Sequence, residues 1–417
     1  MATSPRGLCS HPRKAVPVLV VVAPGQGAQS PGFLDPWLDV PGVRERLEWL
    51  SVVSGIDLIE HGTVSDAETI TDTAIAQPLI VGAGLVTLLS LFPHPSSAYS
   101  SIGAGAGHSV GEITAAVGAG VLSAEQAMVF VRERGKAMAD AAARTQTGMT
   151  AVLGGEPEDI LARCTELGLT PANMNGAGQI VVAGTKAQLE AFAADPPAGC
   201  RVRPLAVAGA FHTEHMAPAV GHLGKLGNAI TTHDPRLRLL SNADGKVVHD
   251  GREVLRRLVH QVSNPVRWDL CMETMADLGV TAVIEIPPAG TLTGLAKRAL
   301  PGVQTLAVKT PDDLDAAWAL INEHGTISHL DSNPTWRMLV APGKGTFRRA
   351  LEVIPGDEVQ ASAIVGNVET LRGATPINAP HGGVLVEWLV EDGDPVSPGQ
   401  PILRLHPVAD HSYEVFA

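Results

Sequence analysis

Cysteine is scarce in this chain, with only four among 417 residues. They stand far apart, at Cys9, Cys164, Cys200 and Cys271, and no two form a Cys-x-x-Cys pair. A disulfide framework needs many cysteines in a short chain, and a zinc ribbon needs closely spaced pairs. The sequence therefore excludes both classes of domain and predicts reduced thiols in a cytoplasmic protein.

Positive charge is also in short supply. The 30 Lys and Arg residues are outnumbered by 43 Asp and Glu residues, which gives a net charge of −13. Proteins that bind nucleic acid neutralise its phosphates with a basic surface. The charge balance therefore argues against nucleic acid as a partner, and an acidic protein partner would need a local basic patch.

Long apolar runs are missing as well. We find none that approaches the roughly 20 residues needed to span a bilayer, and we expect no membrane partner. The apolar stretch 15–23 follows Arg13-Lys14, as in a signal peptide, but Pro24-Gly25-Gln26-Gly27 ends it without an Ala-x-Ala cleavage site. A buried first strand is the preferred interpretation.

The composition itself, with 45% hydrophobic residues, 44 Gly and 31 Pro, indicates a turn-rich α/β protein of two or three domains. We predict a disordered leader over residues 1–14, helical stretches between 29 and 92, and a small α+β insert. The predicted strands are 16–22, 100–103, 149–153, 179–183, 202–207, 237–241 and 282–286. The predicted helices are 113–121, 123–143, 161–167, 188–194, 291–299 and 312–324, with a polar linker over 325–333.

From Met338 onward helical periodicity almost disappears and short β-like runs take its place. This part repeats itself: Ala341-Pro342-Gly343-Lys344-Gly345 and then Gly356-Asp357-Glu358-Val359 are matched by Ala379-Pro380-His381-Gly382-Gly383 and then Gly393-Asp394-Pro395-Val396. Two copies of one β unit predict a small barrel with pseudo-twofold symmetry.

The stretch Gly107-His108-Ser109-Val110-Gly111 reads Gly-x-Ser-x-Gly, which is typical of a serine on a sharp turn from a strand into a helix. A side chain at either glycine would clash in so tight a turn. The Val110 amide would lie at a helix N-terminus, directed toward a developing oxyanion. Ser109 is therefore the candidate nucleophile, although small-residue stretches also match this pattern by chance.

A nucleophilic serine needs a base, and His212 follows the predicted insert, from where it could reach over the main sheet toward Ser109. One alternative is a surface or packed histidine, since the chain has 15. The other is a metal site formed by His212, Glu214 and His215, which lacks the His-Glu-x-x-His spacing.

Two further residues could complete such a site. In Pro24-Gly25-Gln26-Gly27-Ala28-Gln29 the glycines would let the backbone approach another loop, so that the Gln26 amide faces an oxyanion; the alternative is a plain tight turn. Arg134 could grip a carboxylate through two hydrogen bonds if it lies in a pocket; the alternative is a solvated helix face with salt bridges.

Together, over about residues 15–310, these stretches resemble the malonyl-CoA:acyl-carrier-protein transacylase family, which includes the acyltransferase domains of polyketide and fatty-acid synthases. The resemblance rests on Pro24-Gly25-Gln26-Gly27-Ala28-Gln29, Gly107-His108-Ser109-Val110-Gly111-Glu112, Arg134-Gly135-Lys136, Ala172-Asn173-Met174-Asn175, Phe211-His212, and Gln261 with Asn264-Pro265-Val266. One departure is Glu285-Ile286-Pro287-Pro288-Ala289-Gly290, where the family usually has Glu-x-Gly-Pro-Gly.

The resemblance implies an α/β-hydrolase-like core over 15–311 with a ferredoxin-like subdomain inserted at about 145–211. Ser109 would be the nucleophile, His212 its base, and the main-chain carbonyl of Gln261 would orient the imidazole. The amides of Gln26 and Val110 would form the oxyanion hole.

The same resemblance implies the substrates. Malonyl-CoA would acylate Ser109, and the phosphopantetheine thiol of a holo acyl carrier protein would then take the malonyl group in a ping-pong reaction, in fatty-acid or polyketide biosynthesis. Arg134 would pair with the malonyl carboxylate. Phe211 resembles the residue of malonyl-selective members, and we expect its ring to crowd an α-methyl group.

The tail, residues 336–417 after a helix and linker over 312–335, resembles a biotinyl/lipoyl carrier domain. The modified lysine of such domains lies on a hairpin in Glu-Ala-Met-Lys or a similar sequence. Here the hairpin reads Val368-Glu369-Thr370-Leu371-Arg372-Gly373, with Arg372 at the lysine position. A guanidinium cannot form the amide bond to biotin or lipoate, so we predict no attached cofactor and a docking or stabilising role.

Two other functions stay open on the sequence alone. A serine esterase or thioesterase would need an acidic triad member between Ser109 and His212, and several aspartates lie in that interval. A non-catalytic scaffold would act through the tail.

Overall fold

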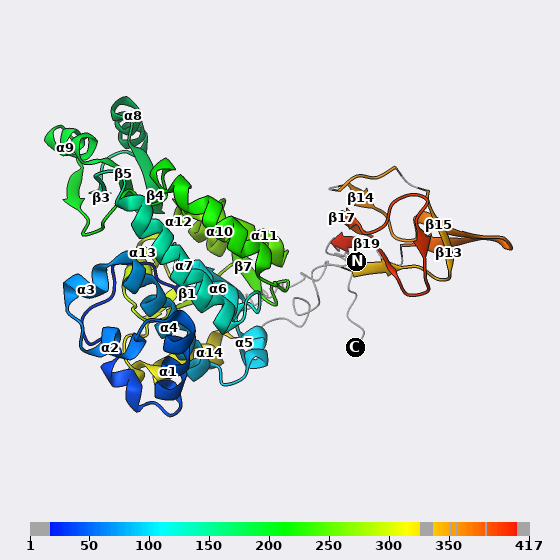
Figure 1. The fold of residues 1–417 in the computed structure, drawn as a ribbon, viewed down its shortest axis with the longest axis horizontal. Helices are drawn as coiled ribbons and strands as arrows, with labels where there is room; N and C mark the ends of the chain where they lie inside the picture. The colour runs from blue at the N-terminus through cyan, green and yellow to red at the C-terminus, as the bar shows by residue number, and fades with distance from the viewer. Residues whose placement is uncertain (1–16, 326–336, 351, 356, 380–381, 407–417) are drawn as a thin grey trace, which may run out of the picture. The chain divides into compact units, whose positions relative to one another are not determined.

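Two separately folded units make up the chain in the computed structural model, which describes residues 17–325 and 337–406 apart from 351, 356 and 380–381 (Figure 1). The first unit extends to Ser328 and the second begins at His329. The predicted leader and nearly all of the predicted linker lie outside the described residues. Helix α14 (Leu314–His324) buries Leu314 and Ala317 in the core of the first unit, so it belongs to that unit.

The first unit is built on a six-stranded sheet with five parallel strands and an antiparallel edge strand. Its order is β11 (Gln304–Ala307), β10 (Ala282–Glu285), β1 (Leu19–Ala23), β2 (Ala104–Gly107), β7 (Arg238–Leu240) and β8 (Val247–Val248). Strand β1 reads Leu-Val-Val-Val-Ala and is buried throughout, as expected for a central strand with both faces covered. The predicted α/β architecture is confirmed, and its assignment as hydrolase-like stays a prediction.

Helices cover both faces of this sheet. Leu19 and Val21 pack into one core with α4 and α7, whereas Val20 and Val22 pack into a second core with α12 and α13. The helices of the unit outside the inserted subdomain, besides α14, are α1 (Val43–Ser54), α2 (Leu58–Thr63), α3 (Ala67–Thr71), α4 (Thr73–Leu91), α5 (Pro95–Ser101), α6 (Gly111–Gly118), α7 (Ala124–Ala142), α10 (Ala217–Ala229), α11 (Gly251–Gln261), α12 (Trp268–Asp277) and α13 (Thr291–Ala299), with short 3-10 turns at Asp35–Asp39, Glu214–Met216 and Pro311–Asp313.

The strand predicted at 100–103 was wrong. Helix α5 continues to Ser101, and the strand that leads to the serine turn is β2, which reads Ala-Gly-Ala-Gly. Such small residues have little β propensity of their own. Pairing with β1 on one side and β7 on the other holds β2 in the sheet, and this tertiary effect leaves no local signal in the sequence.

We expected that no apolar run approaches the length needed to span a bilayer, and this was wrong, because one helix is long enough. Helix α4 is 19 residues long and contains an 18-residue window with a mean hydropathy of 1.9, but 72% of that window is buried inside the fold. Among the described residues it is the single helix that meets the length and composition test. Its burial between neighbouring helices identifies it as a core helix.

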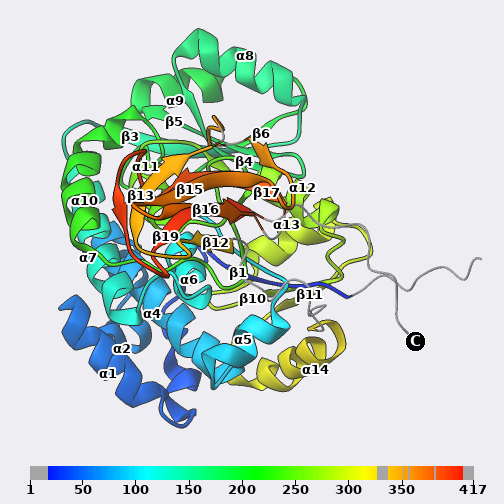
Figure 2. The same cartoon turned by 90° about the vertical axis from the view of Figure 1, so that its right-hand side faces the viewer.

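The small subdomain has the predicted ferredoxin-like organisation. Its chain order is β3 (Thr147–Leu153), α8 (Pro157–Leu167), β4 (Thr170–Gly176), β5 (Gln179–Thr185), α9 (Lys186–Ala194) and β6 (Arg201–Pro204). The sheet order is β6-β3-β5-β4, extended by β9 (Val266–Arg267), which pairs with β4 in parallel. Strand β4 was missed because its sequence, Thr-Pro-Ala-Asn-Met-Asn-Gly, is rich in residue types that are uncommon in strands. The subdomain forms the end of the first unit opposite α1 and α2 (Figure 2).

The second unit contains two four-stranded antiparallel sheets around a core of its own. One sheet has the order β12 (Arg337–Val340), β19 (Pro401–His406), β17 (Gly383–Trp388), β14 (Glu358–Val359); the other has β16 (Gly373–Asn378), β15 (Ile364–Thr370), β13 (Gly345–Arg349), β18 (Pro395–Val396). Strands β15 and β16 pair as far as Thr370 and Gly373, so Leu371 and Arg372 form the hairpin turn. The Leu371 side chain is fully exposed there.

Candidate active site

Ser109 lies on the predicted turn, between the end of β2 at Gly107 and the start of α6 at Gly111. Its backbone has a positive φ of 52°, which is unusual for a residue with a side chain and typical of a strained functional turn. A Cβ atom at Gly107 would collide with the backbone of Gly111, and one at Gly111 would collide with the carbonyl of Ala23. Both glycines are therefore needed for the turn that presents Ser109.

His212 reaches Ser109 as predicted. The distance from His212 Nε2 to Ser109 Oγ is 2.8 Å, and the main-chain carbonyl of Gln261 accepts a hydrogen bond from His212 Nδ1 at 2.8 Å. The second contact leaves Nε2 free to accept the serine proton. Burial lowers the pKa of His212 to about 3, with a further contribution from the charge of Arg134, so the imidazole is neutral at physiological pH.

The predicted oxyanion groups lie beside this pair. Val110 is the N-cap residue of α6, so its amide is at a helix N-terminus. The loop that contains Gln26 packs directly against the serine turn, because a Cβ atom at Gly25 would lie 2.9 Å from the carbonyl oxygen of His108. The Gln26 side chain is held by a 2.9 Å hydrogen bond from its Nε2 to the Thr71 carbonyl. The contact between the two loops is the close approach that the glycines predicted, and the oxyanion role of the two amides stays a prediction.

Arg134 is almost completely buried, so the alternative of a solvated helix face was wrong. Its guanidinium donates to Gln77 Oε1 at 2.5 Å and to Gln261 Oε1 at 2.7 Å, and its Nη2 lies 3.4 Å from Ser109 Oγ. Burial lowers its pKa to about 10, a cost that a buried cation carries when its hydrogen bonds go to neutral amides. The charge of Glu112 opposes this effect without a hydrogen bond to the guanidinium, and a bound carboxylate beside Ser109 would supply a counter-charge in direct contact.

Phe211, directly before His212, is buried in the main core, and its effect on substrate choice stays a prediction. The alternative metal site finds no support in the geometry, since His212 is engaged by Ser109 and Gln261. Glu214 and His215 lie on the following 3-10 turn. Within the described residues there is no group of three or more His, Cys, Asp or Glu placed to hold a metal ion.

Several buried polar residues around the site were not predicted. Asn242 follows β7, and its side chain accepts from the Ser109 amide at 2.8 Å and donates to the Gly107 carbonyl at 2.8 Å. His108 Nε2 lies 2.9 Å from Asn175 Oδ1. Gln77, which holds Arg134, carried one usable signal: it is a lone polar residue in the apolar stretch of α4. Asn242 carried none, because its contacts with the serine turn lie more than 130 residues away in sequence.

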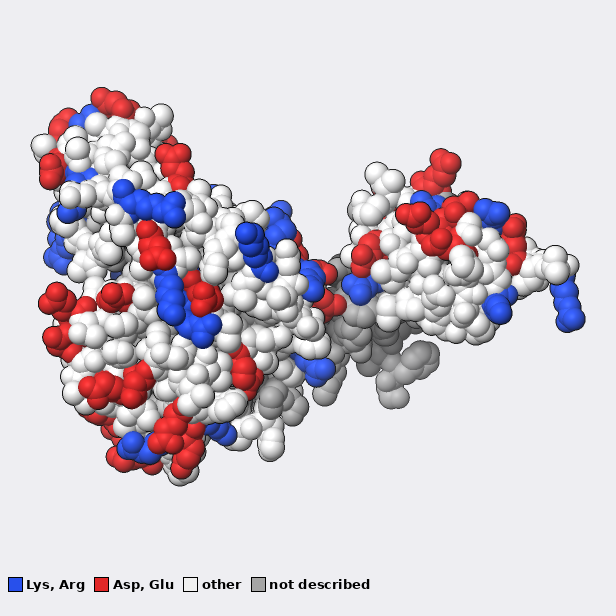
Figure 3. Space-filling view, viewed as in Figure 1, with Lys and Arg blue, Asp and Glu red and all other residues white. Residues whose placement is uncertain are grey.

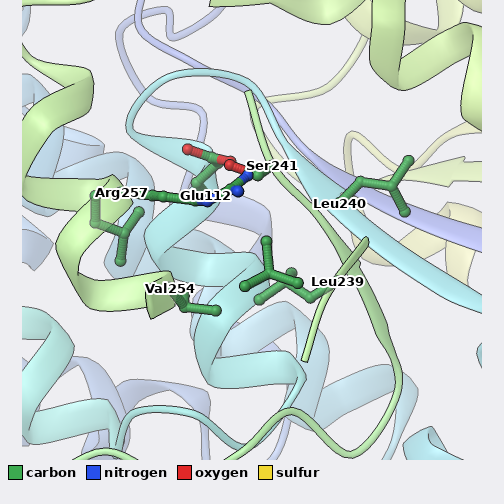
Figure 4. A pocket seen from close by; sticks show the side chains of 8 residues that line it. Glu112, Leu239, Leu240, Ser241, Val254 and Arg257 are labelled. Carbon is green, nitrogen blue, oxygen red and sulfur yellow. The ribbon is translucent and has the colours of Figure 1, made fainter. Parts of the chain in front are cut away.

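Glu112, on the first turn of α6, is another buried group beneath the serine turn. Its carboxylate accepts from the main-chain N–H of Asn242 at 2.6 Å and from Gln261 Nε2. Leu239, Leu240 and Val254 line a small cavity on its other side, where Arg257 also lies (Figure 4). Burial raises the pKa of Glu112 to about 7, against the opposing effects of these hydrogen bonds and of Arg134 and Arg257.

These residues define a serine enzyme that works through an acyl intermediate on a parallel α/β core: Ser109 on its sharp turn, His212 with its carbonyl partner, and the buried Arg134. The acyl transferase domain family matches residues 48–311, and a second family, described as biotin-requiring enzyme, matches 338–405. The malonyl CoA-acyl carrier protein transacylase of Mycobacterium tuberculosis is 49% identical over 303 residues, covering 72% of this chain and 98% of that protein. The Escherichia coli (strain K12) protein of that name is 34% identical over 306 residues, covering 72% and 98%. This chain belongs to the malonyl CoA-acyl carrier protein transacylase family.

Solved structures agree. The crystal structure of MCAT from Mycobacterium tuberculosis matches with a TM-score of 0.70 at 48% identity, covering 72% of this chain and 99% of that one. A malonyl-transacylase in complex with its type II PKS acyl-carrier protein, PlMCAT:AntF (holo), matches with a TM-score of 0.67 at 31% identity, covering 72% and 99%. These matches cover about the length of the first unit and leave the second unit as an addition.

Proposed function

We propose that this chain transfers a malonyl group from malonyl-CoA to the phosphopantetheine thiol of a holo acyl carrier protein, in fatty-acid or polyketide biosynthesis. The observation that carries the proposal is the buried Arg134 guanidinium, 3.4 Å from the nucleophile Ser109 Oγ. An acyl group with a free carboxylate would give this cation an anionic partner, whereas an acetyl group would leave it with neutral partners only in the acyl pocket, at a cost of about 1–3 kcal/mol.

In the first half-reaction Ser109 Oγ attacks the thioester carbonyl of malonyl-CoA while His212 Nε2 takes the hydroxyl proton. The Gln26 and Val110 amides would donate hydrogen bonds to the resulting oxyanion. The tetrahedral intermediate collapses, the C–S bond breaks, and the proton on His212 goes to the departing CoA thiolate. The malonyl group then remains on Ser109 as an oxygen ester.

In the second half-reaction the thiol of the carrier protein gives its proton to His212 Nε2 and its sulfur attacks the malonyl ester. The C–O bond to Ser109 breaks, and His212 returns the proton to the serine oxygen. Throughout, the Gln261 carbonyl keeps the imidazole in the tautomer with its proton on Nδ1. Phe211, next to His212, is the residue we expect to disfavour an α-methyl group on the substrate.

Incubation with radiolabelled malonyl-CoA tests the proposal. We expect stable label on Ser109 that is released quickly by a holo acyl carrier protein and slowly by water. Rapid release by water without transfer would instead support a serine esterase. A Ser109→Ala variant should take up no label; if it keeps the biological activity of the wild type, the chain is a scaffold that acts through its tail.

For the tail, we propose a domain of the biotinyl/lipoyl type without an attached cofactor, because the hairpin turn carries Leu371 and Arg372 and no lysine. Its role would be docking or stabilisation. We also propose a cytoplasmic protein without nucleic-acid or membrane partners. The net charge of −13 supports the first exclusion, and acidic side chains are prominent at the α1–α3 end of the first unit (Figure 3).

A further inference from the structure

Gln261 serves two parts of the site at once. It is the last residue of α11, and its main-chain carbonyl accepts from His212 Nδ1 while its side-chain Oε1 accepts from Arg134 Nη2 at 2.7 Å. The backbone contact is independent of which way the carboxamide points. The side-chain contact is not, because a half turn of the amide would direct its NH₂ group at the guanidinium.

The surroundings of the Gln261 amide nitrogen decide this orientation. Nε2 faces only acceptors: the Ser109 carbonyl at 3.0 Å, Asn242 Oδ1 at 3.2 Å and a carboxylate oxygen of Glu112. Of these, Glu112 is the one group that can carry a charge, and when ionised its carboxylate accepts hydrogen bonds without donating any. Its second oxygen accepts a hydrogen bond from the main-chain N–H of Asn242 at 2.6 Å, so the carboxylate itself is fixed.

We propose that Glu112 is a positioning residue that fixes the orientation of the Gln261 carboxamide and thereby holds Arg134 for the carboxylate of the acyl group. The inference rests on the proposed function, since it concerns how malonyl is selected. Glu112 acts through Gln261 and not on the reacting atoms, because His212 already occupies the position of the base at Ser109 Oγ. The result is a continuous buried chain from Glu112 through Gln261 to Arg134.

The variant Glu112→Gln tests this chain with almost no change in shape. The carbonyl oxygen of the new amide can still accept from Asn242, but its NH₂ group then faces the NH₂ group of Gln261. Gln261 must rotate, which turns a donor toward Arg134. At pH 8, where Glu112 of the wild type is ionised, we expect kcat/KM for malonyl-CoA to fall about 10- to 100-fold, with a relative gain for acetyl-CoA.

A second readout separates substrate selection from the catalytic pair. A fluorophosphonate modifies an activated serine and has no carboxylate for Arg134 to bind. We expect its rate with Ser109 to stay within about threefold of the wild type in Glu112→Gln. An equal fall in both rates would show that Glu112 supports the serine turn alone, and an unchanged preference for malonyl-CoA would show that it has no effect on Arg134; either result overturns the proposal.

Gln261→Met gives the test of mechanism, because it removes the carboxamide and keeps the main-chain carbonyl. If Glu112 acts through Gln261, the double variant with Glu112→Gln and Gln261→Met should be no less selective for malonyl-CoA than Gln261→Met alone. If the losses of selectivity in the two single variants multiply in the double variant, the proposal is contradicted. Glu285→Gln is the matched control: Glu285 is also buried but caps α13, accepting from the main-chain amides of Gly290, Leu292 and Thr293. It should change stability and leave selectivity as it is.

Two further measurements keep the result interpretable. If Glu112→Gln does not fold, Glu112→Asp, which keeps the charge and shortens the reach, should shift the preference in the same direction, and no shift would overturn the proposal. Malonyl transfer by the wild type is measured first. Its absence would refute the proposed function, whereas its presence together with unchanged selectivity in the Glu112 variants would refute only the role of Glu112.

Discussion

At the scale of single residues, burial does more for this site than any ion pair. Arg134 lies among amide oxygens and His212 beside a carbonyl, and burial lowers the pKa of each side chain from its usual value. The arginine is thereby a buried cation whose hydrogen bonds go to neutral groups, and binding of an anion beside it would be favourable. The histidine becomes a base that stays unprotonated well into the acid range.

Replacing Arg134 by alanine should therefore change which acyl group is preferred. We expect kcat/KM for malonyl-CoA to fall about 10- to 100-fold, since the substrate carboxylate loses its charged partner, while acetyl-CoA gains in relative terms. Steady-state transfer assays with both substrates measure this. Arg132→Ala, on the same helix but paired with Glu133, serves as the control. An unchanged ratio of the two substrates would remove Arg134 from its role.

The low pKa of His212 predicts an unusual pH profile. A histidine with an ordinary pKa near 6.5 would lose about tenfold of its neutral form between pH 7.5 and 5.5. Because the pKa of His212 is lowered to about 3, the neutral form persists across this range. The rate of Ser109 modification by a fluorophosphonate should then change less than about twofold. An acid limb centred near pH 6.5 would contradict the expected burial of the imidazole.

At the scale of elements, the turn between β2 and α6 depends on two backbones coming closer than a Cβ atom allows. Gly111→Ala should abolish Ser109 labelling and destabilise the fold by several kcal/mol, because the new methyl group would meet the Ala23 carbonyl in a backbone that cannot move aside. Thermal unfolding and labelling measure the two effects. Gly118→Ala, at the other end of α6, meets only the end of the Leu88 side chain at 3.3 Å and should be tolerated.

The same scale shows how far the sequence could predict the molecule. Strand β1 and helix α7 were evident, because one is a continuous apolar run and the other begins with a capping box at Ser123 and Gln126. Strands β2 and β4 were misplaced or missed, since pairing with neighbouring strands and not local propensity makes them strands.

The site divides in the same way. Ser109, His212, Arg134 and Gln261 come together as the family resemblance implied. Asn242 could not be predicted, because a polar residue after a short strand says nothing about which distant backbone it will bind. The side-chain link from Glu112 through Gln261 was likewise invisible, because it depends on the orientation of one amide group.

At the scale of the whole molecule, the chain joins an acyltransferase unit to a β unit that has a separate hydrophobic core. The turn of the β15–β16 hairpin offers a guanidinium where a carrier domain would need an amine. We expect the intact mass to show neither biotin nor lipoate when the chain is co-expressed with the corresponding ligases. The variant R372K should become an acceptor for one of them if the hairpin keeps the geometry that a ligase recognises. A mass increase on the wild-type chain would refute the prediction.

The contact between the imidazole and the Gln261 carbonyl has one more consequence. Where many serine enzymes use a carboxylate side chain, this site uses a main-chain carbonyl. Every residue type has such a carbonyl. Side-chain replacement at position 261 therefore cannot remove the partner of His212. A systematic alanine scan would find the nucleophile and the base and would leave their third member unseen; exposing it would take chemical synthesis with an altered main-chain atom.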